Sequence, residues 1–408
     1  MGAHRTAPVS PGGAAGPVRF AAVPLPVPTR ADFLLDPDLV FLNHGSFGAV
    51  PRAVQAEYQR LQDRMERNPV EWLGRRSDDL LGRARARLGE FVGAATDDLV
   101  FFPNPTTGIN MVVNSLRLRP GDQVVSTDHE YGAMIRTWRK ATAAVGAEWV
   151  PVEIPLPVTT EADFVDRVWG AVTERTRVLF LSHITSATAL VFPVAELCRR
   201  ARAAGILAIV DGAHVPNHVP LDIEALDCDV YAGALNKWVC APKGSAFLWA
   251  RPEVQEWLQP LIVSWGWESD HPSASQFVDH HQWQGTRDLS PFLAVPAALD
   301  FVATHDWAAV RAESHRLALA MRDAVNAHTG LPALSGGGEW LGQMAAVHLP
   351  EGTDVADLQA RLFDRHRVEV PCSMWNGRPL LRVSCNAHTS EADVTAFAAA
   401  IAAELPAG

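Results

Sequence analysis

The sequence predicts an α/β fold with two parts: a large domain with a mainly parallel central sheet flanked by helices, and a smaller α+β domain at the C-terminal end. From about residue 98 to residue 250, short continuous apolar runs alternate with segments of helical periodicity, which is typical of parallel strands buried on both faces. After a long helical stretch at 290–328, the strand and helix patterns become shorter. We therefore expect residues 31–304, including an N-terminal segment, to form the large domain and residues 305–408 the small one.

The expected elements follow one another in a regular order. Two helical segments, 51–73 and 78–93, precede the first strand. Strands of the large domain are expected at 98–103, 122–128, 177–184, 206–214, 229–236 and 245–250, with helices at 106–118, 132–146 and 194–205. In the small domain we expect strands at 344–350, 368–372 and 379–384, and helices at 354–367 and 391–405.

Composition narrows the class of protein. The chain has 408 residues, of which 48% are hydrophobic and 20% charged, and its formal net charge is −11. This acidic balance argues against a nucleic-acid binder, which would carry a basic surface. No apolar run approaches the roughly 18 residues of a membrane span. We expect an enzyme or an interaction protein that binds neither nucleic acid nor membrane.

The cysteines and the N-terminal segment give information on the cellular compartment of the protein. The five cysteines are widely spaced and form no CxxC pair, so they suggest neither a metal site nor a disulfide framework. A reducing cytoplasm is the simplest interpretation. Residues 1–30 are rich in Pro, Ala and Gly and lack a continuous apolar segment, so we expect a disordered tail rather than a signal peptide.

Polar residues at the ends of the expected strands are the first candidates for a site, because ligands bind beyond the carboxyl ends of strands in open α/β sheets. Asp211 follows five consecutive apolar residues, and His214 lies three positions later. A strand-end aspartate can cap a turn, or it can be a buried anion that awaits a cationic partner.

Two further strand ends carry candidate ligand groups. Thr106 and Thr107 would begin a helix, where free backbone N–H groups and hydroxyls can bind an anion, although threonine is also common as a helix cap. Tyr131 is one of three tyrosines, and it could stack on a planar ligand or pack in the core.

Lys237 stands out because the chain contains only three lysines, Lys140, Lys237 and Lys243, among 35 basic residues. It directly follows an apolar run. A lysine in such surroundings loses hydration, which lowers its pKa and frees the amine for Schiff-base chemistry. The alternative is a surface lysine whose stem covers apolar groups. Together these residues make up the parts of a pyridoxal-phosphate (PLP) site: a phosphate cup, a ring stacker, a carboxylate for the ring nitrogen and a Schiff-base lysine.

The segment "DGAHVP…DVYAGALNKWVCAPKG" resembles the aspartate-to-lysine segment of the class V aminotransferase family of PLP enzymes, which includes cysteine desulfurases and isopenicillin N epimerases. The resemblance extends from about residue 33 over nearly the whole chain. "FLNHGSFGAVP", "SHITSATALVFPVAELC", "QGTRDLSPFLAVPAALDF" and "LLRVSCNAHTSEADV" are similar to the isopenicillin N epimerase-like branch. The resemblance implies PLP fold type I.

The resemblance also implies roles for the cofactor-site residues. Lys237 matches the Schiff-base lysine, and Asp211 the carboxylate that keeps the pyridine nitrogen protonated. Tyr131 matches the ring-stacking aromatic residue, and it is included with Lys237 and Asp211 among the expected catalytic residues. Thr106 and Thr107 match the phosphate-binding turn, and the position of His214 in the family lies near the phenolic oxygen of the cofactor.

The remaining matches concern the substrate and the partner subunit. Arg382 matches the arginine that binds the substrate carboxylate, a task suited to a bidentate guanidinium. Asn43 and His44 lie in a segment that the family folds over the substrate. Gly285 and Thr286 match a loop that reaches the phosphate of the neighbouring subunit's cofactor, which implies a homodimer with shared sites.

The chain departs from the family pattern at two places. The family often has Ser-x-His before the lysine, where this chain has Ala234, Leu235 and Asn236. Asn236 can still donate one hydrogen bond to the phosphate, whereas Ala234 cannot. Ser186 stands where desulfurases often have an asparagine near the phenolic oxygen.

The sequence predicts the identity of the cofactor more clearly than the reaction. Epimerisation needs a second base opposite Lys237, for which His44 and Tyr131 are candidates. Desulfuration needs a nucleophilic cysteine, and Cys372 is the one candidate by position. C–S cleavage by β-elimination needs only Lys237, and decarboxylation with oxidative deamination of an S-substituted cysteine, as in lincosamide-type or ergothioneine-type pathways, is a related outcome. Aminotransfer and a non-catalytic binding protein are further alternatives. For each enzyme the substrate is a small amino-acid-type molecule.

Overall fold

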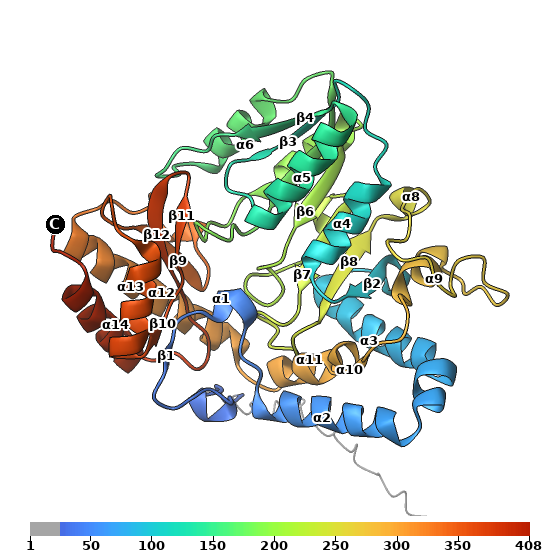
Figure 1. Cartoon of the computed structure of the whole chain (residues 1–408), viewed down its shortest axis with the longest axis horizontal. Helices are drawn as coiled ribbons and strands as arrows, with labels where there is room; N and C mark the ends of the chain where they lie inside the picture. The colour runs from blue at the N-terminus through green and yellow to red at the C-terminus, as the bar shows by residue number, and fades with distance from the viewer. Residues whose placement is uncertain (1–24) are drawn as a thin grey trace, which may run out of the picture.

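The computed structural model describes residues 25–408, so residues 1–24 of the expected disordered tail lie outside the described residues. A seven-stranded sheet forms the centre of the large part (Figure 1). Its strands are β2 (Leu99–Phe102), β3 (Gln123–Thr127), β4 (Glu148–Val152), β5 (Thr176–Ser182), β6 (Leu207–Asp211), β7 (Val230–Ala234) and β8 (Ala246–Ala250).

The order of strands across the sheet is β2-β8-β7-β6-β5-β3-β4. All neighbouring pairs from β7 to β4 are parallel, and β8 runs antiparallel to both β7 and β2. The expected mainly parallel sheet is therefore confirmed. In the register of β5 with β6, Ser182 lies directly opposite Asp211, and both residues end their strands. Parallel pairing thus brings these side chains to one edge of the sheet.

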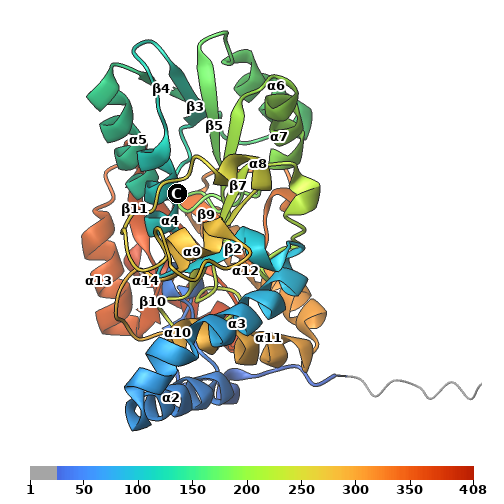
Figure 2. The ribbon, with the colours of Figure 1, turned by 90° about the vertical axis from the view of Figure 1, so that its right-hand side faces the viewer.

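Helices cover both faces of this sheet, as Figure 2 shows for the part around β3 and β5. Apolar residues of β2, β3 and β5 alternate between the two faces. One set packs with α4 (Pro105–Ser115) and α5 (Gly132–Val145). The other set packs with α6 (Glu161–Gly170) and α7 (Val194–Ala203). This double cover explains why the strands read as continuous apolar runs.

Below the central sheet in Figure 1 lie two helices that precede β2, α2 (Arg52–Arg67) and α3 (Ser77–Val92), and two that follow β8, α10 (Ser290–Leu293) and α11 (Val295–Ala303). The expected helix 51–73 is α2 (Arg52–Arg67) followed by the short π-helical turn η2 (Val70–Arg75), and α3 (Ser77–Val92) follows. Short 3-10 turns are η1 (Arg30–Asp32), η3 (Thr96–Asp98), η4 (Glu224–Leu226) and η5 (Gly338–Trp340). The expected long helix 290–328 is divided into α10 (Ser290–Leu293), α11 (Val295–Ala303) and α12 (Trp307–Thr329), and α8 (Pro252–Gln255) and α9 (Gln276–Gln282) precede it.

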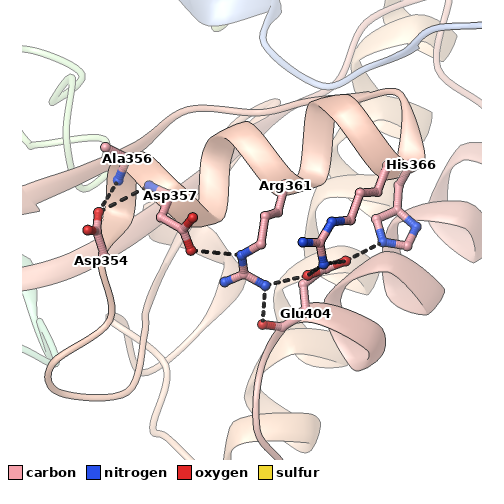
Figure 3. Close-up of polar contacts among 7 residues, drawn as sticks. Asp354, Ala356, Asp357, Arg361, His366 and Glu404 are labelled. Atoms are coloured by element: carbon pink, nitrogen blue, oxygen red, sulfur yellow. Dashed lines mark hydrogen bonds and ion pairs between the residues drawn. The ribbon is translucent and has the colours of Figure 1, made fainter.

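The C-terminal part contains a second, three-stranded antiparallel sheet with the order β11-β12-β9. Its elements after α12 are β9 (Met344–His348), α13 (Val355–His366), β10 (Val368–Glu369), β11 (Cys372–Trp375), β12 (Arg378–Ser384) and α14 (Glu391–Glu404). Asp354 caps α13 by accepting bonds from the N–H groups of Ala356 and Asp357, and Arg361 and His366 bind Glu404 at the end of α14 (Figure 3). These contacts fix the two helices to each other.

The N-terminal segment connects the two parts. Strand β1 (Val40–Phe41) pairs in parallel with β10 of the C-terminal part, and α1 (His44–Phe47) follows at once. In Figure 1, α1 lies between the C-terminal elements and the ends of the central strands. The N–H of Asp306 also bonds to the carbonyl of Pro26. The division into residues 31–304 and 305–408 stays a prediction, and the pair β1–β10 joins the N-terminal segment to the C-terminal part. Among the described residues, none of the helices combines the length and apolarity needed to cross a membrane.

Candidate active site

A cavity of about 280 Å³ lies at the carboxyl ends of β5, β6 and β7, closed on one side by α1. Eight of the residues predicted from the sequence line it: Thr106, Tyr131, Ser186, Asp211, His214, Asn236, Lys237 and Arg382. Gly45, Ser46, Phe47, Asn104, Pro105, Ser182, Ile184, Ala213 and Ala234 complete its lining. The residues that the sequence distributes over nearly 340 positions thus meet in one place.

Lys237 lies just after β7, and the residue is half-buried. Its Nζ lies 3.0 Å from Nε2 of His214. Burial, with a smaller contribution from the positive charge of Arg382, lowers the pKa of Lys237 to about 7, although the charge of Asp211 opposes the shift. A large fraction of the amine is therefore uncharged at neutral pH, which is the form that attacks a carbonyl carbon.

Asp211 ends β6 and is also buried. Its Oδ1 accepts a hydrogen bond from the N–H of Ala213 at 3.0 Å. Burial raises the pKa of the Asp211 carboxyl, while that hydrogen bond and the nearby charge of Lys237 act in the opposite direction. A cationic group placed in the cavity would favour the ionised form of Asp211 further.

Helix α4 points its N-terminus at the cavity. Asn104 caps the helix, because its Oδ1 accepts bonds from both the N–H and the hydroxyl of Thr107. Thr107 is thereby turned to Asn104, and it does not line the cavity, whereas Thr106 does. At the anion-binding N-terminus of α4, Asn104 and Thr106 therefore line the cavity.

Two aromatic residues lie at the open side of the cavity. Tyr131 directly precedes α5 and is 46% exposed, and Phe47 of α1 is 69% exposed. Asn236 donates a hydrogen bond from Nδ2 to the carbonyl of Phe47 at 3.0 Å. Asn236, which was predicted to contact a phosphate, thus also holds α1 at the cavity.

Arg382 enters the cavity from β12 of the C-terminal part. Its guanidinium donates to the carbonyl oxygen of Ser186 at 2.5 Å and to the hydroxyl of Ser46 at 3.1 Å. Ser46 in turn donates to Oδ1 of Asn43 at 2.5 Å. Nε of Arg382 is buried and has no partner among the described residues. Asn43 does not line the cavity, but it acts on Arg382 through Ser46.

His44 lies behind Lys237 rather than in the cavity. Its Nε2 donates to the backbone carbonyl of Lys237 at 3.0 Å, and its Nδ1 lies 3.1 Å from Nε2 of His388. Burial lowers the pKa of His44 to about 3. His44 therefore connects the lysine loop to the small domain and is neutral at physiological pH.

Gly285 and Thr286 lie in the loop between α9 and α10 and do not line this cavity. Gly285 has a φ of +100°, which favours glycine, and Thr286 is exposed. Their predicted role concerns the partner subunit. Within residues 25–408 no group of three or more His, Cys, Asp or Glu side chains is arranged to hold a metal ion.

Residues that line the cavity or bond to its lining were also missed by the sequence prediction. Ser182 lines the cavity, and Glu130 accepts a hydrogen bond from the hydroxyl of Ser182. Ser46 binds Arg382, and Lys243 donates from Nζ to the carbonyl of Gly48 at 3.0 Å. A signal for Glu130 existed in the sequence, since a carboxylate between an apolar strand and Tyr131 is unusual, but its partner Ser182 lies 52 positions away.

Comparisons with known proteins place the chain in a family. Residues 46–397 match the family model of the class V aminotransferases. The chain is 36% identical over 385 residues to the isopenicillin N epimerase of Amycolatopsis lactamdurans, covering 91% of this chain and 96% of the relative. It is 27% identical to a probable chloroplastic L-cysteine desulfhydrase of Arabidopsis thaliana, covering 82% of this chain and 75% of the relative. A solved structure of the C-DES protein with glycine covalently linked to its PLP cofactor superposes with a TM-score of 0.80 at 19% identity, covering 92% of this chain and 99% of that one.

The cavity residues fit the cofactor that this match implies. The buried amine of Lys237 can hold the aldehyde carbon, the carboxyl of Asp211 the ring nitrogen, and the N-terminus of α4 the phosphate. Nδ1 of His214 is buried and without a partner among the described residues, as is Nε of Arg382, so polar atoms beside the cavity await a ligand. The chain belongs to the class V aminotransferase family, and it is an enzyme whose cofactor is pyridoxal 5′-phosphate.

Proposed function

We propose that this enzyme removes and returns the proton at Cα of an amino acid or amino-acid conjugate, as an isopenicillin N epimerase-like enzyme of natural-product metabolism. One observation carries the proposal: the cavity combines the amine of Lys237 with the buried guanidinium of Arg382, and none of its lining residues is a cysteine. The 36% identity to isopenicillin N epimerase supports the same choice. These groups suit proton transfer at Cα and provide no sulfur nucleophile.

Each of the chain's own groups has a defined task in this proposal. The guanidinium of Arg382, held by Ser186 and Ser46, binds the carboxylate of the substrate. The amine of Lys237, whose pKa is lowered to about 7, accepts the α-proton on one face. The bound cofactor supplies the electron withdrawal that makes this proton acidic.

An epimerase needs a second acid or base on the opposite face of Cα. His44 and Tyr131 were the two candidates. His44 does not suit this task, because its ring is outside the cavity and both of its nitrogens have protein partners. Tyr131 lines the cavity and is accessible, so we assign the second proton transfer to its hydroxyl or to a water molecule that it orients.

The second candidate function is C–S cleavage by β-elimination from an S-substituted cysteine. It is favoured by the similarity to a probable cysteine desulfhydrase and needs only the Lys237 base. Decarboxylation with oxidative deamination of such a substrate, and aminotransfer, use the same amine and guanidinium. A non-catalytic role is disfavoured by the presence of both groups in one cavity.

The test is to incubate the holoenzyme in deuterated water with isopenicillin N, free cysteine and a bulky S-conjugated cysteine, and to follow products by mass spectrometry. The proposal predicts deuterium at Cα and accumulation of the opposite configuration, with the total amount of the two epimers unchanged. Lys237→Ala should abolish both, whereas Lys243→Ala should retain them. Pyruvate and ammonia without epimer would reject the proposal in favour of β-elimination.

We further propose a cytoplasmic homodimer in which Gly285 and Thr286 complete the partner's cofactor site. Their distance from the cavity of their own chain supports this arrangement. Mixing Lys237→Ala subunits with Thr286→Ala subunits tests it: hybrid dimers should regain cofactor affinity at one site in two. If the mixture binds no better than the two variants alone, the shared site is rejected.

A further inference from the structure

Glu130 is a buried carboxyl for which neither the proposed reaction nor the family resemblance gives a task. It lies between β3 and α5, directly before Tyr131, and is 4% exposed. Its Oε1 accepts a hydrogen bond from the hydroxyl of Thr127 at 2.7 Å. Its Oε2 lies 2.5 Å from the hydroxyl of Ser182, which is part of the cavity wall.

Ser182 connects Glu130 to the cofactor carboxylate. Ser182 ends β5 and lies directly opposite Asp211 in the parallel pair β5–β6. Side chains at directly opposite positions of two paired strands lie on the same face of the sheet. Asp211 and Ser182 therefore share one face of the sheet, Ser182 bonds to Glu130, and the charge of Asp211 acts on Glu130.

A negative charge on Glu130, in addition to that on Asp211, would not be compensated by the groups around it. The groups that face it are Thr127 from β3, Ser182 from β5 and Asp211 from β6. His129, its neighbour in the chain, directs Nδ1 to Thr188 and Nε2 to the carbonyl of Ile154. No arginine or lysine in the described part of the chain forms an ion pair with Glu130, whereas Asp211 has the charge of Lys237 nearby.

These surroundings determine which of the two carboxyl groups, Glu130 or Asp211, holds a proton. Burial, together with the charge of Asp211, raises the pKa of Glu130 to about 7, although the bonds from Ser182 and Thr127 oppose the shift. When two neighbouring carboxyls share a site, the one without a cation keeps the proton. Below about pH 7 the proton of this pair is thus held by Glu130 rather than by Asp211, which has the charge of Lys237 nearby.

The hydroxyl of Ser182 must follow the protonation of Glu130. The hydroxyl of Thr127 accepts from the N–H of His129 at 3.3 Å and donates to Oε1, so its direction is fixed. A protonated Oε2 donates to Ser182, which frees the Ser182 hydrogen to turn toward the cavity and Asp211. An ionised Oε2 accepts that hydrogen instead.

We propose that Glu130 is a positioning residue that acts through Ser182: its protonated form lets Ser182 donate to Asp211 and stabilise the charge that holds the cofactor ring nitrogen, and its ionised form withdraws that bond. The inference rests on the cofactor assignment and on no particular reaction. It predicts that the environment of the cofactor ring changes across neutral pH even in the absence of substrate.

The experiment has two readouts other than activity. Infrared spectroscopy of the apoenzyme and the holoenzyme should show a protonated buried carboxyl that disappears on titration to alkaline pH and that is missing from Glu130→Gln. The visible absorbance of the wild-type holoenzyme should change in a step near the same pH. Glu130→Gln, whose amide can donate to Ser182 at every pH, should keep the spectrum of the acid form throughout. Glu161→Gln, at an exposed position, is the matched control and should titrate like wild type.

Ser182→Ala tests the role of the Ser182 hydroxyl independently of the charge on Glu130. This variant should keep the infrared titration of Glu130 but lose at least half of the absorbance step. An unchanged absorbance step in either Glu130→Gln or Ser182→Ala would overturn the inference, as would an infrared spectrum showing Glu130 ionised at pH 6. The wild-type infrared titration needs no variant to fold. Because it can be made without cofactor, it also distinguishes a failure of this inference from a failure of the cofactor assignment.

Discussion

The two sides of the cofactor cavity are built in different ways. On the strand side, Asp211, Ser182 and Lys237 each lie at or just after the end of a buried strand, and neighbouring strands bring them together. On the cover side, residues 43–48 lie outside the central sheet, and Asn43 makes one isolated bridge to Ser384 of β12. They are held by bonds to residues about 190 to 340 positions away: Phe47 to Asn236, Gly45 to Ser384 and Ser46 to Arg382.

Because of this difference, the strand side holds the reacting groups, and the cover side closes the cavity. The strand side keeps its side chains in place through a sheet that forms independently of the ligand, so it can present an amine and a carboxyl at fixed positions. The cover side is made of individual contacts between the N-terminal segment and both parts of the molecule. We expect substitutions on the strand side to remove function and substitutions on the cover side to weaken binding.

The largest effect is expected for Lys237→Ala on the strand side. It removes the one amine in the cavity, so covalent cofactor and its visible absorbance should be lost, and turnover should fall by more than about 10³-fold. Lys243→Ala is the matched control, since Lys243 lies in the same loop and bonds only to the carbonyl of Gly48. Equal loss in both variants would show that the loop, and not the amine of Lys237, is responsible.

Arg382→Lys tests the point where the two sides meet. A lysine retains the positive charge but cannot bond to Ser186, Ser46 and a carboxylate in one plane. KM should rise by about 10- to 100-fold, corresponding to a loss of roughly 2 kcal/mol in substrate binding, with cofactor absorbance unchanged. Arg378→Lys, at an exposed position of the same strand, should leave KM within about twofold. Loss of the cofactor in Arg382→Lys would contradict its assignment to substrate.

Gly48→Ala addresses the cover alone. Gly48 has a φ of +73°, and a Cβ there would lie 2.0 Å from the carbonyl oxygen of Asn236. Backbone strain and this clash should together destabilise the cover by about 1–3 kcal/mol and lower cofactor affinity, measured by equilibrium dialysis and thermal unfolding. Gly121→Ala is the control: its φ is +85°, but no atom lies within 4 Å of the added Cβ. A Gly48→Ala enzyme with wild-type cofactor affinity would show that the cover is not needed for binding.

The same division explains what the sequence could predict. The strand ends were predictable because continuous apolar runs mark buried parallel strands and the polar residue after each run is conspicuous. Strand β4 was missed because it lies at the sheet edge, is partly exposed and contains Pro151, so its pattern is not that of a buried strand. The contacts of Ser46 with Arg382 and of His44 with His388 were not predictable, because no local pattern specifies which distant segments meet.

Glu130 shows the limit on the strand side itself. It lies in a segment that the sequence singled out for Tyr131, yet its pKa depends on Ser182 and Asp211, which belong to other strands. A sequence shows that a carboxyl follows a strand, but not whether a cation lies nearby. That distinction decides whether the group is charged, and it needs the register of the sheet.

The smallest effect is expected for Cys372→Ser, and this result would exclude desulfuration. Cys372 lies on β11 opposite Leu381, so its side chain shares the face of Leu381, while Arg382 points to the other face of the small sheet. Burial raises the pKa of its thiol to about 12, which leaves almost no thiolate at neutral pH. Turnover of the true substrate should therefore change by less than about twofold. A loss of turnover of two or more orders of magnitude, with persulfide formed by the wild type, would contradict this prediction. It would require the small sheet to reorient and bring the thiol to Arg382, and the small sheet would then take as much part in the chemistry as the strand side.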